Sequence, residues 1–63
     1  GRFVEELEAV RKRILLEVAD ANERKAALGE LVGEESMNFF VREGTEAWRQ
    51  RADERIRRAV AGA

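Results

Sequence analysis

Residues 31–37 of this 63-residue chain read Leu-Val-Gly-Glu-Glu-Ser-Met and separate two long stretches of helical pattern. Gly33 can follow a helix with a positive φ, because it has no Cβ to clash with the backbone. Ser36 can accept a hydrogen bond from a free backbone N–H where the next helix begins, and the two glutamates before it suit the positive end of that helix. The stretch therefore predicts two helices that fold back on each other, with a joint at residues 33–35.

The first pattern predicts one helix over about residues 2–32. Its apolar residues recur three or four positions apart from Phe3 to Val32, so they share one side of an α-helix. No proline interrupts them, and acid precedes base at i,i+4 in pairs such as Asp20 and Arg24. This helix is expected to contribute the first half of an apolar seam, namely Leu7, Val10, Ile14 and Val18.

Residues 13–18 also allow a different interpretation, as a short β-strand. They are rich in branched apolar residues, and Ile14, Leu16 and Val18 would then share one face. Leu15 breaks the strict alternation, and neither glycine nor proline flanks the segment. We therefore favour the helix.

The second pattern predicts a helix over about residues 36–61. Apolar residues again recur at helical spacing, and acid–base pairs at i,i+4 support it. Gly44 lies on the apolar stripe, where it either permits close approach of another backbone or marks a small break before Thr45; we favour close approach. This helix is expected to complete the seam with Phe40, Val41, Trp48 and Ile56.

Several apolar residues point away from the seam, which either predicts a partner that covers them or is the ordinary exposure of single apolar side chains on a protein surface. Ala27 and Leu31 fall off the stripe of the first helix, and Leu16 points away from it almost completely. Phe39 likewise points away from the stripe of the second helix, where it would either anchor a second subunit or pack over the joint beside Leu31. A chain of this size buries a core that is only marginally sufficient, so a second subunit is a natural source of further burial. The expected partner interface consists of Leu15, Leu16 and Phe39.

The composition argues against catalysis and against a membrane span. Charged residues make up 40% of the chain but the net charge is only −1, so the whole molecule has no bulk attraction for nucleic acid. Without His or Cys, neither a thiolate metal site nor an ordinary general base is available. No apolar run approaches the length of a transmembrane helix. We expect a non-enzymatic, cytoplasmic protein without cofactor, metal or membrane partner, and the initial Gly1 leads us to expect a cleaved tag or a longer parent protein.

Residues 36–48 resemble the second helix of ribbon-helix-helix repressors and antitoxins. In that family a serine opens the helix, two large apolar residues follow four and five positions on, an arginine comes next, and a small residue lies at position eight. The corresponding residues in this chain are Ser36, Phe40, Val41, Arg42 and Gly44.

The resemblance implies a dimeric DNA-binding regulator with a short strand ahead of its helices. In that arrangement Arg13, Leu15 and Glu17 would be the strand side chains that enter the major groove. Ser36 and Asn38 would present the start of the helix to a phosphate. Nucleic acid is a partner only under this alternative.

The sequence as a whole favours an all-α fold in one unit spanning residues 1–63. We expect a two-helix hairpin that dimerises into a four-helix bundle with coiled-coil packing. The expected function is protein–protein interaction or oligomerisation in an assembly or regulatory role. The partner would be a second copy or the helices of another protein.

Overall fold

The computed structural model describes residues 1–62 and places them in four helices, with no strand among those residues. The all-α class is therefore confirmed. The helices are α1 (Arg2–Glu17), α2 (Ala21–Val32), α3 (Glu34–Glu43) and α4 (Thr45–Gly62). None of them is long and apolar enough to cross a membrane.

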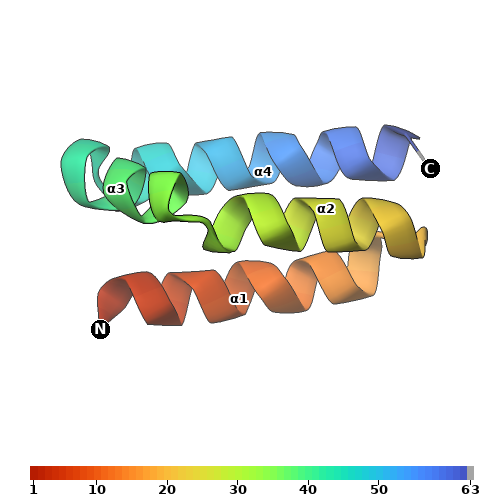
Figure 1. Ribbon diagram of the computed structural model, residues 1–63, viewed down its shortest axis with the longest axis horizontal. Helices are drawn as coiled ribbons and strands as arrows, with labels where there is room; N and C mark the ends of the chain where they lie inside the picture. Colours follow the sequence, from red (N-terminus) through yellow and green to blue (C-terminus); the bar gives the residue numbers. More distant parts are fainter. Residues whose placement is uncertain (63) are drawn as a thin grey trace.

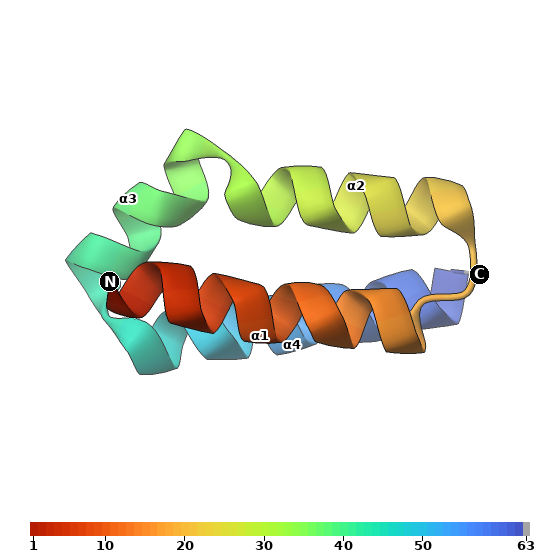
Figure 2. The same ribbon diagram turned by 90° about the horizontal axis from the view of Figure 1, so that it is seen from below.

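Three of the helices form a bundle within the single chain. α1, α2 and α4 contact one another pairwise, and α2 runs antiparallel to the other two (Figures 1 and 2). α3 lies across the end of the bundle where α1 begins and α2 finishes (Figure 2). The bundle extends 31 × 17 × 17 Å. The expected two-helix hairpin is thus not what the chain forms, because the segment taken for one first helix folds back on itself.

The turn between α1 and α2 explains this difference. Val18 leaves the helix with φ −95° and ψ 108°, and the side chain of Asp20 accepts a hydrogen bond from the backbone N–H of Glu23 at 2.9 Å, which caps the start of α2. Arg24 donates to the carbonyl oxygens of Val18 and Ala19, both at 3.1 Å. The predicted pair of Asp20 with Arg24 is therefore replaced by two backbone contacts that stabilise a turn. The prediction of one helix over residues 2–32 was wrong at this point.

The joint after α2 lies at the predicted place but has different chemistry. Gly33 adopts φ −68° and ψ 158° rather than a positive φ, and its carbonyl oxygen accepts hydrogen bonds from the backbone N–H groups of Ser36 and Met37. α3 already begins at Glu34, so Ser36 does not cap it. Ser36 is buried instead, and its hydroxyl donates to the carbonyl oxygen of Glu30 near the end of α2. This bond ties α3 to α2.

Gly44 divides the second predicted helix into α3 and α4. It has φ 97° and ψ 169°, a conformation that residues with a Cβ rarely adopt, and an added Cβ would meet no atom within 4 Å. The small break is therefore correct, and the close approach was wrong. In a continuous helix Met37 and Val41 would be in phase with the core of α4. The break rotates α3, so Met37 and Val41 are exposed while Ser36 and Phe40 are buried.

The two glycine joints differ in how they should respond to alanine. Gly44→Ala forces a side chain into a positive-φ conformation and should destabilise the chain by about 1–3 kcal/mol. Gly33→Ala is the matched control, because its φ suits any residue and the new Cβ would lie 3.6 Å from two carbonyl oxygens, an ordinary contact. Urea titrations followed by circular dichroism compare the two. Equal losses of stability would contradict the assignment of the break to Gly44.

The core lies along the axis shared by α1, α2 and α4. Trp48 is packed edge-to-face against Phe3 and Phe40, with centroid separations of 5.7 Å in both cases, and those two rings are 4.9 Å apart. Among the predicted seam residues only Val41 is plainly outside, with 74% of its surface exposed, and Leu7 packs at the edge. Ala27 and Leu31 are buried although they were expected off the stripe, because the turn at residues 18–20 resets the helical phase. The buried apolar residues are Val10, Ile14, Val18, Ala27, Leu31, Phe40, Trp48, Ala52, Ile56 and Ala59.

Ion pairs join α4 to α1 and to α2. Arg49 donates to both carboxylate oxygens of Glu6 on α1 at 2.7 Å, and this hydrogen bond raises the pKa of the Arg49 guanidinium. Arg55 Nε lies 2.6 Å from Glu30 Oε2 on α2, an ion pair that lacks hydrogen-bond geometry. Each pair has one half-exposed partner, and ion pairs open to solvent add little to stability, so we expect these two mainly to favour one register of the helices.

Candidate interaction surfaces

Large apolar side chains remain exposed at both ends of the bundle. At the end that carries α3, they come from the start of α1, the end of α2 and α3 itself (Figure 1). We call this set the α3-end surface; it consists of Val4, Val32, Met37 and Val41. At the opposite end, where α1 and α4 finish, the exposed apolar residues are Leu15, Leu16 and Val60.

Leu16 is the most exposed large apolar residue of the described chain, with 85% of its surface in solvent. It is two positions after Ile14, which is completely buried, and successive side chains on a helix differ by about 100° in direction. Leu16 therefore points almost directly away from the core. Leu15, at 48% exposure, lies between these two directions. The sequence correctly placed both leucines outside the core.

Phe39 does not join the two leucines. It lies on α3, at the other end of the bundle, and is partly buried against the core. The guanidinium carbon of Arg51 lies 4.9 Å from the centroid of its ring, which is the geometry of a cation–π contact. The structure thus separates the predicted partner interface into two places, and Phe39 already has an intrachain neighbour.

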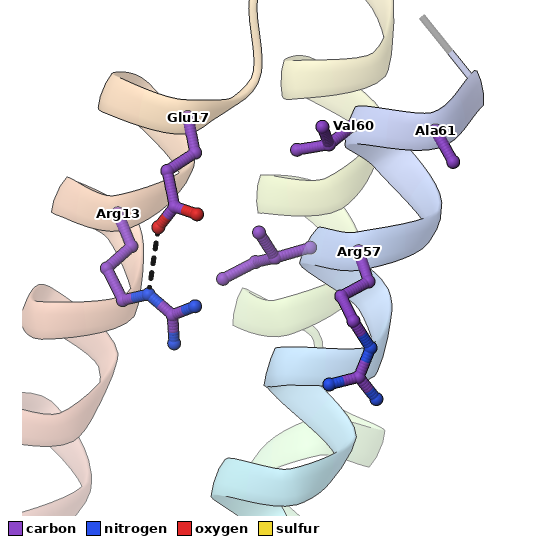
Figure 3. A pocket seen from close by; sticks show the side chains of 6 residues that line it. Arg13, Glu17, Arg57, Val60 and Ala61 are labelled. Carbon is purple, nitrogen blue, oxygen red and sulfur yellow. Dashed lines mark hydrogen bonds and ion pairs between the residues drawn. The ribbon is translucent and has the colours of Figure 1, made fainter.

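A groove runs between α1 and α4 close to Leu16. We call it the α1–α4 groove; its volume is about 440 Å³, and it is open to solvent (Figure 3). Its apolar part is supplied by α4, where Ile56 is buried and Val60 is 46% exposed. In Figure 3 the side chain of Val60 points toward α1, while Arg57 extends along α4 away from Glu17. The residues that line the groove are Arg13, Glu17, Ile56, Arg57, Val60 and Ala61.

Arg13 and Glu17 on the α1 side of the groove belong to a small charge network that reaches α4. Arg13 Nε donates to Glu17 Oε2 at 3.0 Å, and another nitrogen of the same guanidinium donates to Asp53 on α4. The hydrogen bond to Asp53, followed by that to Glu17, raises the pKa of Arg13. One cation and two carboxylates give this cluster of Arg13, Glu17 and Asp53 a net charge of −1. Lys12, four residues before Leu16 and so on the same outer side of α1, forms no ion pair among the described residues.

The residues of the DNA-binding alternative are not brought together. Residues 13–17 are helical, so the strand interpretation was wrong and the ribbon that this alternative requires is missing from residues 1–62. Arg13 and Glu17 pair with each other beside α4, whereas Leu15 occupies another face of α1. Ser36 is buried, and Asn38 is exposed on α3 at the far end.

The α1–α4 groove was missed in the sequence because it depends on the turn between α1 and α2. The spacing of Asp20 and Glu23, an acid at the N-cap with a glutamate three residues later, is a recognised signature of a helix start. Weighed against the uninterrupted apolar pattern, that signature could have divided the first helix. Only then do α1 and α4 run in the same direction (Figure 1), so that Val60 becomes part of a surface with Glu17.

No three His, Cys, Asp or Glu side chains among residues 1–62 are grouped so that they could hold a metal ion. The surfaces described above consist of exposed apolar side chains, and the groove also has charged residues at its border. Comparison with protein-family models, with curated proteins and with solved structures finds no match to this chain.

Proposed function

We propose that this chain is a non-enzymatic oligomerisation module that acts in the cytoplasm by binding protein, with a homodimer as its basic assembly. The observation that carries the proposal is the exposure of Leu16. The core of the bundle is closed by residues of the same chain, so this leucine is not needed for the fold of the monomer. Leu16 exposes apolar surface to water, and the burial of that surface against a second protein would be favourable in free energy.

The energetics favour a second copy as the partner. Burying a large apolar side chain completely is worth roughly 1.5–3 kcal/mol, and a two-fold interface uses each such residue twice. A core in a chain this short rarely supplies more than about 3–5 kcal/mol, so dimerisation would add a substantial share of the stability. With a net charge of −1, two copies have almost no overall repulsion to overcome.

We expect the melting temperature of the chain to rise with its own concentration. Folded dimers are favoured by mass action, so each tenfold increase in concentration above the dissociation constant should raise the midpoint by several degrees. Melting followed by circular dichroism from low to high micromolar concentration measures this. Leu16→Glu should make the midpoint nearly independent of concentration. A flat midpoint for the unmodified chain would contradict self-association and move the proposal to docking on the helices of a different protein.

A further inference from the structure

Leu16 and the α1–α4 groove lie next to each other at the same end of the molecule. Two of the residues that line the groove, Arg13 and Glu17, are three residues before and one residue after Leu16 on α1. A projecting apolar side chain and an apolar recess are therefore on adjoining parts of one surface. Leu16 cannot fill the groove of its own chain, because it points away from the core, whereas Ile56 is buried and Val60 points toward α1 (Figure 3).

We infer that Leu16 of each copy inserts into the α1–α4 groove of the other copy. The inference rests on the proposed homodimer and specifies its interface. In a two-fold dimer both subunits use the same surface patch. Leu16 of the first chain then faces the groove of the second chain, and Leu16 of the second chain faces the groove of the first. Helices commonly pack in this way, with a side chain of one helix placed in a hole formed by residues of its neighbours.

The groove suits a leucine better than it suits a small polar ligand. Ile56 and Val60 offer branched carbon surface, and a volume of about 440 Å³ has room for an aliphatic side chain together with the stems of its neighbours. The guanidinium of Arg13 on the α1 side already donates to both Glu17 and Asp53, so it is not free to bind an anionic ligand. The recess is also open to solvent along its length, which allows a helix surface to close it.

The charges at the border favour a second copy of this chain. On α1 the groove is bordered by Arg13 and Glu17, and Asp53 on α4 completes a cluster of one guanidinium and two carboxylates whose net charge is −1. Lys12 approaches with Leu16, because residues four apart lie on the same side of a helix. Its ammonium would therefore approach this cluster in the partner. Arg57 on the opposite border extends away from Glu17 in Figure 3. Complementary charges of this kind fix the register of an interface more than they raise its affinity.

A pair of complementary variants tests the inference. Leu16→Glu places a carboxylate in the apolar recess of the partner and next to its Arg13–Glu17–Asp53 cluster, whose net charge is −1, and Val60→Lys places an ammonium in the recess. Both positions are exposed in the monomer, at 85% and 46%, so the fold should survive, and circular dichroism checks that it does. Each variant alone should dimerise at least tenfold more weakly than the unmodified chain in sedimentation equilibrium.

An equimolar mixture of the two variants should recover the dimer. In the mixed dimer, the unmodified Leu16 of one chain enters the unmodified groove of the other, and the second junction pairs the introduced glutamate with the introduced lysine. Native mass spectrometry should find the mixed species in excess over both homodimers. Met37→Glu is the matched control, because it adds the same charge at a half-exposed apolar residue on the α3-end surface; it should leave the dissociation constant unchanged.

The outcomes separate the inference from the function on which it rests. A dimer that persists in Leu16→Glu and Val60→Lys but is lost in Met37→Glu would overturn the inference and keep self-association. If Leu16→Glu abolishes the dimer while Val60→Lys has no effect, or if the mixture of variants does not recover the dimer, Leu16 lies outside the groove. Either result would also overturn the inference. An unmodified chain that is monomeric up to millimolar concentration would overturn both.

Discussion

Ile14→Asp is expected to unfold the chain. Ile14 is completely buried on α1, the helix that packs against both α2 and α4. Aspartate removes the apolar contacts and leaves either a buried unpaired charge or a buried neutral acid. Together these losses should reach about 5 kcal/mol, which is the scale of the whole stability of a domain this small. The far-ultraviolet circular dichroism spectrum should lose most of its helical signal.

Val41→Asp is the matched control for this experiment. The sequence pattern assigned Val41 to the same apolar seam as Ile14, but the rotation of α3 at Gly44 leaves Val41 74% exposed. The carboxylate would remain in water, so the helical signal should be retained. A chain that unfolds equally in both variants would favour one continuous second helix and contradict the break.

Trp48→Ala is expected to have the second-largest effect. Trp48 is 1% exposed and contacts both Phe3 and Phe40 edge-to-face, so it joins the start of α1 to α3 and α4. Replacing a buried tryptophan by alanine costs about 3–5 kcal/mol, because transfer energy is lost and a cavity remains. Urea unfolding followed by circular dichroism should therefore begin at much lower denaturant concentration, or the chain should be partly unfolded in buffer.

A second aromatic substitution distinguishes packing at this end from a general loss of core. Phe39→Ala removes a ring of α3 that is only partly buried and lies against Arg51 rather than in the aromatic cluster. It should cost clearly less than Trp48→Ala. Equal costs would mean that Trp48 is not the centre of this end of the bundle.

Much of the fold could be predicted from helical periodicity, because every described element is a helix and seven of the eight predicted seam residues pack in or against the core. The number of helices could not be predicted in this way. Periodicity identifies apolar positions within a helix but passes over a turn that lacks glycine and proline, as at residues 18–20. At Gly44 the sequence allowed either a break in the helix or the close approach of another backbone. The backbone angle φ of Gly44 decides between them, and composition does not specify that angle.

The candidate surface divides in the same way. Leu16 could be recognised because its direction follows from its position relative to Ile14 in one helix. The α1–α4 groove could not be recognised from the sequence. Glu17 and Val60 come together only because the chain reverses its direction between α1 and α2. Phe39 was expected to be an exposed anchor, but its contact with Arg51 depends on the rotation of α3 relative to α4.

Sedimentation equilibrium of the unmodified chain tests the central claim of self-association most directly. The account predicts that the weight-average mass rises from that of one chain at low micromolar concentration to twice that value at high concentration, with no larger species. A mass that stays at one chain throughout this range, while circular dichroism reports an intact helical fold, would contradict the account.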